Sequence, residues 1–253
     1  AFWDNSGTNA IRRVQFADGT VWDTGTMKQI LSTVTGTEEG DQLTGHSASF
    51  GYDENETFHA GGGNDTIWAG SGNDVLYGEE GDDYLDGGDV NDILYGGDGS
   101  DQLEGGFGDD LLVGGAGSDT LSGGFGDDTY LFASGDGQDT IRELGDGQDT
   151  VVFGDGIGSA DLIFRKEYND LRISVAGSQD SILISDQFGY EGNRVEYFKT
   201  SDGSLMDYTK LELMIQAMAS FEDTTGMMWE DAVQSKDERV DDFVNQWWTK
   251  EAI

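Results

Sequence analysis

The 253-residue sequence contains no cysteine and no proline. Without cysteine there is no disulfide bond, no thiol nucleophile and no cysteine zinc site. A bound metal ion is then the obvious source of added stability if the protein works outside the cell. Only two histidines are present, His46 and His59, and neither lies in an HExxH motif. GxSxG and GxxxxGK[ST] motifs are also absent, so we expect no enzymatic activity.

Basic residues are scarce as well. The chain has 13 lysines and arginines against 51 aspartates and glutamates, a formal net charge of −38. Such a surface argues against nucleic acid or an anionic membrane as a direct partner, and the compact state repels itself unless cations neutralise it. The sequence shows no long apolar run and no N-terminal signal peptide. We expect a fragment of a longer protein, in which only other parts contact a membrane.

Glycine is abundant instead, with 40 residues, and much of it lies in a nine-residue repeat that runs without insertion from residue 60 to residue 131. The consensus row is GGxGxDxUx, where U is a large apolar residue; Val90 and the Glu79–Glu80 pair depart from it most. The sixth place is aspartate in every row: Asp65, Asp74, Asp83, Asp92, Asp101, Asp110, Asp119 and Asp128. The eighth place is apolar in every row: Ile67, Leu76, Leu85, Leu94, Leu103, Leu112, Leu121 and Tyr130. This period indicates stacked structural repeats.

The repeat length predicts the architecture of the stack. If six residues form a turn and three form a short strand, two rows complete one coil of a flattened right-handed helix. Rows two apart then stack at about 4.8 Å in one sheet. The eighth-place residues would point inward as two columns and form a narrow core. We therefore predict a mainly all-β fold: a right-handed parallel β-roll of nonapeptide repeats, with a β-rich cap and C-terminal α-helices.

The sixth-place aspartates would form two columns of like charge. Neighbouring carboxylates would repel by about 0.9 kcal/mol even at the dielectric of water, so the columns require cations between the turns. Carboxylates and backbone carbonyls are hard oxygen ligands, which favours Ca²⁺ over transition metals. Eight rows paired two apart give six sites, so we expect about six or more ions.

Three further sets of residues complete the predicted metal ligands. The fourth-place glycines offer backbone carbonyls: Gly63, Gly72, Gly81, Gly99, Gly108, Gly117 and Gly126. The fifth place offers polar side chains: Asn64, Asn73, Asp82, Asn91, Asp109 and Asp127. Imperfect rows flank the repeat at residues 36–44, 51–59, 135–143 and 145–153, and a six-residue interruption separates the first two. Their acids could form end sites: Asp41, Asp139 and Asp149, with Glu56 in the aspartate place.

The flanks of the repeat suggest a cap and a duplication. Strand-like runs at 161–164, 170–177 and 180–188 predict an antiparallel cap, which an open sheet edge requires. Two amphipathic helices are expected, one on the stripe Leu211, Met214, Ile215 and Met218 and one spanning residues 229–247. The segment ADGTVWD at 17–23 is repeated as SDGSLMD at 201–207. We divide the chain into the tail of a preceding repeat block (1–35, strands and a short helix), a calcium-binding roll (36–153), a β-rich cap (154–207) and a helical flank (208–253).

The repeated rows resemble the nonapeptide repeats of the RTX proteins, and the order GDDTYLF, GDGQDTI, NDLRISVAG and DSILISDQF resembles the last repeat block of adenylate cyclase toxins and related cytotoxins. This resemblance implies a secreted bacterial protein, exported by a type I secretion system through an uncleaved C-terminal signal in or near residues 211–253. It also implies folding driven by extracellular calcium. The expected partners are calcium ions and the secretion machinery, without nucleic acid, and the expected state is a monomer.

Other interpretations of these features stay open. A Gly/Asp-rich stretch can be a flexible linker, although a linker has no reason to place leucine at every ninth residue. The chain could also be a surface- or carbohydrate-binding module of a large adhesin, or the carrier domain of a secreted lipase or protease. Trp229, Trp247, Trp248 and the Met227–Met228 pair could form a membrane or partner face, but core packing is the more common role of such a stripe.

Overall fold

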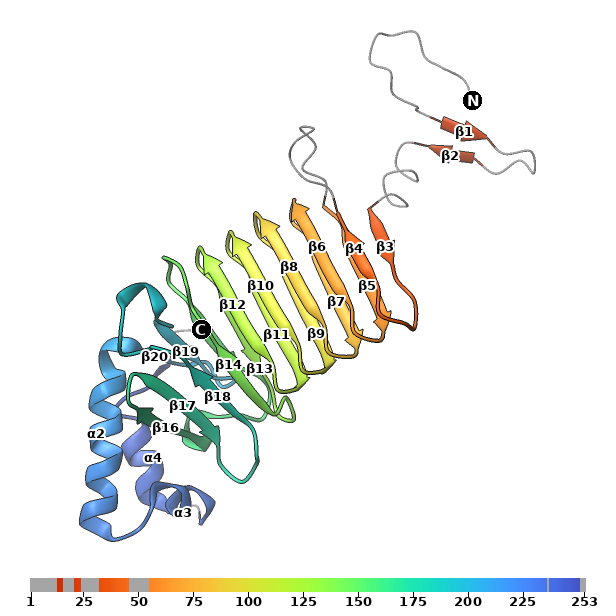
Figure 1. The fold of residues 1–253 in the computed structure, drawn as a ribbon. Coiled ribbons are helices and arrows are strands. Elements are labelled where there is room, and N and C mark those ends of the chain that lie inside the picture. The colour runs from red at the N-terminus through yellow and green to blue at the C-terminus, as the bar shows by residue number, and fades with distance from the viewer. Residues whose placement is uncertain (1–12, 16–20, 24–31, 46–54, 236, 251–253) are drawn as a thin grey trace.

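The computed structural model of the protein describes residues 13–15, 21–23, 32–45, 55–235 and 237–250. Most of these residues form two long sheets that face each other along a regular roll, with a helical region at the C-terminal end of the roll (Figure 1). Successive strands of the roll alternate between the two sheets. The predicted parallel β-roll with C-terminal helices is confirmed.

The roll strands of the first sheet are β4 (Gln42–Thr44), β6 (Thr66–Ser71), β8 (Tyr84–Asp89), β10 (Gln102–Phe107), β12 (Thr120–Phe125) and β14 (Gln138–Ile141). Those of the second sheet are β3 (Thr33–Thr35), β5 (Thr57–Gly62), β7 (Val75–Glu80), β9 (Ile93–Gly99), β11 (Leu111–Gly117), β13 (Thr129–Phe132) and β15 (Thr150–Phe153). Each strand pairs in parallel with the next strand of its own sheet, so Leu103 of β10 lies between Leu85 and Leu121. Rows two apart therefore stack as predicted.

The strands of the central rows are longer than the predicted three residues. Strand β10, for example, spans six residues and includes the glycine pair at the start of the next row, in which Gly106 pairs with Gly88 and Gly124. Because identical turns stack in register, the hydrogen-bonded pairing of the strands continues into the glycines. The sequence of a single row does not show this extension. All eight predicted core residues are at most 3% exposed, so the two apolar columns are confirmed.

Both imperfect rows before the repeat join the stack. Strand β3 pairs with β5 and β4 pairs with β6, each in parallel. Val34 and Leu43 pack against the core from these first strands. The interruption at residues 45–50 lies almost entirely outside the described residues, yet the rows on both sides of it keep their places in the two sheets.

The cap first extends both sheets of the roll with one parallel strand each, and its outer strands then pair antiparallel. Strand β18 (Ser181–Ile184) pairs in parallel with β14, and β19 (Tyr197–Lys199) pairs in parallel with β15. Antiparallel strands follow: β17 (Asp170–Val175) and β16 (Leu162–Glu167) in the first sheet, and β20 (Ser204–Asp207) and β21 (Thr249–Lys250) in the second. The predicted antiparallel pairing is confirmed among β16, β17 and β18, whereas the parallel pairing of β18 and β19 with the roll was not predicted. Short 3₁₀ helices η2 (Ser159–Asp161) and η3 (Glu191–Asn193) lie in the connections.

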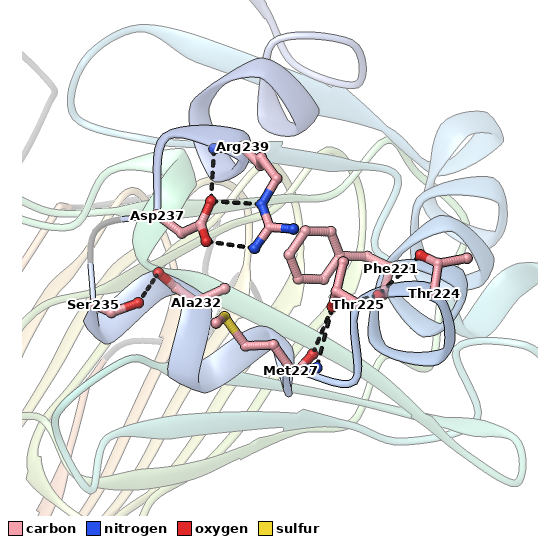
Figure 2. Close-up of polar contacts among 8 residues, drawn as sticks. All are labelled: Phe221, Thr224, Thr225, Met227, Ala232, Ser235, Asp237 and Arg239. Carbon is pink, nitrogen blue, oxygen red and sulfur yellow. Dashed lines mark hydrogen bonds and ion pairs between the residues drawn. The ribbon is translucent and has the colours of Figure 1, made fainter.

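The described residues of the C-terminal flank form three helices rather than the expected two: α2 (Tyr208–Thr225), α3 (Trp229–Gln234) and α4 (Glu238–Val244). The segment between α3 and α4 interrupts the second predicted helix, because Asp237 there accepts hydrogen bonds from the backbone and the guanidinium of Arg239 (Figure 2). The Arg239 guanidinium also lies 5.1 Å from the centre of the Phe221 ring. No helix within the described ranges is both long and apolar enough to cross a membrane.

The tryptophan stripe of this flank packs inward. Trp229 is 1% exposed and lies against the rings of Phe221 and Phe243. Trp248 is also buried and contacts the ring of Phe164 in the cap. Core packing therefore explains these two tryptophans: Trp229 joins the three helices to one another, and Trp248 joins the segment after α4 to the cap.

The duplicated segment forms the same hairpin twice. Strands β1 (Arg13–Gln15) and β2 (Val21–Asp23) pair Arg13 with Asp23, and β19 and β20 pair Tyr197 with Asp207. Gln15 pairs with Val21 and Lys199 pairs with Leu205, so the same number of residues separates the paired positions in both copies. The short helix expected near residues 27–31 lies outside the described residues.

Candidate metal centre

Two columns of acidic side chains follow the turns of the roll. In each column, one carboxylate oxygen accepts a hydrogen bond from the backbone N–H of the acidic residue one coil earlier; the N–H of Asp83, for example, donates to Oδ1 of Asp101 at 2.8 Å. The first column lies at the start of the strands of the first sheet and contains Asp41, Asp65, Asp83, Asp101, Asp119 and Asp139. The second precedes the strands of the second sheet and contains Glu56, Asp74, Asp92, Asp110, Asp128, Asp149 and Glu196.

The structure thus aligns the eight sixth-place aspartates with Asp41, Asp139, Asp149 and Glu56 from the imperfect rows. Glu196 extends the second column into the cap: the N–H of Asp149 donates to its Oε2 at 3.0 Å. Sequence reasoning missed Glu196 because it lies 47 residues after Asp149. The signal that could have found it is an acid directly before a strand, since Glu196 precedes β19 as Asp149 precedes β15.

The second carboxylate oxygen is buried in both columns. Oδ2 has no hydrogen-bond partner in Asp65, Asp83, Asp92, Asp101, Asp110, Asp119 and Asp128, and these side chains are at most 3% exposed. A buried, unsatisfied carboxylate oxygen is costly, by about 1–3 kcal/mol or more. Its repetition at every turn indicates that a cation belongs beside each of these oxygens.

A backbone carbonyl oxygen lies close to Oδ2 in the same turns. A methyl group added to Gly96 would lie 2.4 Å from Oδ2 of Asp101 and 2.5 Å from the carbonyl oxygen of Gly114 in the neighbouring coil. Gly78 and Gly105 have the same surroundings. Two hard oxygen donors therefore converge over the first-place glycine, and this donor set fits Ca²⁺. Sequence reasoning singled out the fourth-place glycines and missed these.

The fourth-place glycines allow the coils to stack closely. Gly81 has a φ of +132°, and a methyl group on it would lie 1.9 Å from the carbonyl oxygen of Gly63. A residue with a Cβ would push the coils apart at this contact. The same φ sign occurs in the other predicted members of the set: Gly63, Gly72, Gly99, Gly108, Gly117 and Gly126. Their carbonyls stay predicted ligands.

The fifth-place side chains form a separate ladder on the outside of the turns. Oδ1 of Asp82 accepts the N–H of Ser100 at 2.8 Å, and Oδ1 of Asp109 accepts the N–H of Asp127 at 2.9 Å. Asn64, Asn91 and Asp127 make the corresponding bonds to later rows, while the N–H of Asn73 donates to Asn55. These side chains satisfy exposed turn N–H groups and keep negative charge beside the buried columns.

Burial raises the pKa of Asp65 and of the column carboxyls from Asp83 onward, and neighbouring acids add to the effect. The pKa rises to about 8 in Asp92, Asp139 and Asp149 and to about 7 in Asp101 and Asp128. Asp83, Asp110 and Asp119 reach about 6. Hydrogen bonds from backbone N–H groups oppose the shift only in part. Without a cation, the folded columns therefore tend to hold protons.

This fold and donor set define a calcium-binding β-roll. Residues 50–85, 59–94, 78–112, 95–130 and 104–141 match the RTX calcium-binding nonapeptide repeat. Residues 1–26 and 170–210 both match the haemolysin-type calcium binding protein related domain. The roll of this chain therefore consists of RTX calcium-binding nonapeptide repeats. The two latter matches end three residues after Asp23 and Asp207, at equivalent positions of the duplicated hairpin.

Replacing Asp101 with asparagine should weaken calcium binding without emptying the core. Asparagine keeps the Oδ1 acceptor for the N–H of Asp83 but removes the charge of Oδ2. We expect the calcium concentration that half-saturates the affected sites to rise roughly tenfold, which corresponds to about 1.4 kcal/mol of binding free energy. Calcium titration of both proteins measures the shift, and an unchanged titration would contradict the role of Asp101.

Proposed function

We propose that this chain is a calcium-triggered folding unit of a secreted bacterial protein of the RTX toxin type, with a structural rather than a catalytic role. Residues 36–153 form the roll in this proposal, residues 154–207 the cap and residues 208–253 the helical flank with the secretion signal. Residues 1–35 are the tail of a preceding block, and its last strand, β3, stacks on the roll. The observation that supports it most is the row of buried Oδ2 atoms without hydrogen-bond partners.

The proposed trigger is the difference in calcium concentration across the cell envelope. In the cytosol, the net charge of −38 keeps the chain expanded and suited to passage through a type I secretion channel. Outside, modular sites with dissociation constants of ~10⁻⁴–10⁻³ M can fill. Because no site exists before the turns close, the free energy of binding becomes free energy of folding. About six or more ions per chain are expected.

The cap gives the folding a starting point. The helical flank and then the cap leave the channel first, and the cap contains the strands β18 and β19 on which the last roll strands pair. Buried aromatic contacts such as Phe164 with Trp248 can stabilise this end before the roll is complete. Coils can then add one at a time toward the N-terminus, which would hinder backsliding into the channel.

A calcium titration followed by circular dichroism and small-angle X-ray scattering tests this function. The calcium-free chain is expected to be expanded and poor in β-structure, and millimolar calcium is expected to produce a compact, β-rich form. Magnesium is the control, because it requires shorter and more strictly octahedral coordination. A β-spectrum and radius that do not change when calcium is chelated would contradict the proposal.

A surface- or carbohydrate-binding module is the second candidate, because one observation favours it. Phe107 and Phe125 are 58% and 49% exposed, and their rings stack with centroids 5.1 Å apart. Exposed, parallel aromatic rings can bind sugar faces. A glycan-binding screen with calcium-loaded protein and a Phe107→Ala/Phe125→Ala variant would distinguish this candidate from a purely structural unit.

A further inference from the structure

Glu143 occupies an unusual place in the roll. Strands β12 and β14 pair Leu121 with Ile141, so continuing this register by two residues sets Glu143 beside Gly123, the first glycine of its row. In the preceding coils of the second column, a glycine carbonyl fills the equivalent place: the carbonyl of Gly123 itself lies near Oδ2 of Asp110 across Gly105. At the last regular coil, the chain therefore supplies a carboxylate side chain where earlier coils supply a backbone oxygen.

Local contacts turn the Glu143 side chain into the protein. It is 1% exposed. Its Oε1 accepts the N–H groups of Gly124 at 3.2 Å and Leu144 at 3.1 Å. Its Oε2 accepts the hydroxyl proton of Tyr130, and that hydroxyl oxygen accepts the N–H of Gly123 at 2.7 Å. Tyr130 is the only tyrosine at the eighth place of the eight rows. Its hydrogen bond to Glu143 therefore has no equivalent in the other rows of the repeat.

The resulting end cluster consists of Asp128, Glu143 and Asp149. One carboxylate oxygen from each lies within 4.8 Å of the others, and all three side chains are at most 3% exposed. Oδ2 of Asp128 has no hydrogen-bond partner. Three buried acids this close repel one another strongly, whereas a cation with ligand distances of about 2.3–2.6 Å can lie between oxygens with this spacing.

We propose that the end cluster holds one calcium ion in a three-carboxylate site, chemically distinct from the other sites beside first-place glycines, where a backbone carbonyl takes the place of the third carboxylate. This inference rests on the proposed function, because it assumes that the chain binds calcium. The affinity of oxygen sites for calcium rises with ligand charge and rigidity. The end cluster therefore fills before the other sites as calcium rises. Its ion joins the last regular coil to the strand β15, on which the cap strand β19 pairs.

Counting bound ions by native mass spectrometry tests the site. The full chain is titrated with calcium, and the number of ions per chain is compared for the unchanged protein and Glu143→Gln. Glu104→Gln is the matched control, since Oε2 of Glu104 also accepts a tyrosine hydroxyl, that of Tyr84 at 2.9 Å, but outside the end cluster. We expect Glu143→Gln to bind one ion fewer and to lose the first binding step, and Glu104→Gln to match the unchanged protein.

The outcomes separate this inference from the function on which it rests. If the unchanged protein binds no calcium, the proposed function fails. If it binds calcium and Glu143→Gln keeps the full number of ions with the same first step, only the end-cluster site is refuted. If Glu143→Gln does not fold, the site is tested by anomalous diffraction from crystals of the unchanged protein grown with terbium in place of calcium. An anomalous peak among the three carboxylates supports the site, and its absence there with peaks in other turns refutes it.

Discussion

Replacing Leu103 with alanine is expected to lower the free energy of unfolding of the calcium-saturated protein by about 2–5 kcal/mol. Leu103 is 0% exposed and lies in register between Leu85 and Leu121. The core at each coil consists of little more than one such side chain from each sheet. Because the ladders above and below fix the backbone, neighbouring residues have little freedom to fill the cavity.

Denaturant unfolding at saturating calcium measures this change. Asp101→Asn is the comparison, because Asp101 lies two residues before Leu103, directly before the strand β10 that contains it. The leucine variant should stay less stable at every calcium concentration, whereas added calcium should restore most of the stability of the asparagine variant. If excess calcium rescues both variants equally, the apolar columns do not contribute independently to stability.

The repeat determined the central part of the fold because its period fixes the register. A leucine at every ninth residue can be buried on one side of each coil only if rows two apart stack, and this stacking also aligns the aspartates. The same logic extended the columns to Asp41 and Asp149, where the rows are imperfect but the acid and the following strand are kept. Both the core and the carboxylate columns could therefore be predicted from sequence.

The parts that could not be predicted depend on contacts between distant residues. Glu143 enters the site through the register of β12 with β14 and a hydroxyl group on Tyr130. Glu196 joins the second column through a chain reversal in the cap. The helix break before α4 depends on the bonds of Asp237 with Arg239, which an apolar stripe does not reveal. None of these contacts follows from a local period.

Acidification is expected to favour the folded state of the calcium-free protein, opposite to the usual behaviour of paired carboxylates. The pKa values of Asp83, Asp92, Asp101 and Asp149 are raised from 3.8 to about 6–8, first by desolvation and then by neighbouring acids. The folded state then binds more protons than the unfolded state between about pH 4 and pH 8, so its stability is highest at the acidic end and is lost as the pH rises through this window.

Circular dichroism in chelator across this pH range measures the effect. The β-signal should increase from pH 8 toward pH 4.5, and calcium binding near pH 7 should release protons, because the ion displaces them from the columns. Asp92→Asn is the control: Asp92 has a pKa raised to about 8, and an asparagine cannot ionise, so this variant should show a weaker pH dependence without calcium. A calcium-free chain that is most structured at pH 8 would show that proton uptake by the buried columns does not govern its folding.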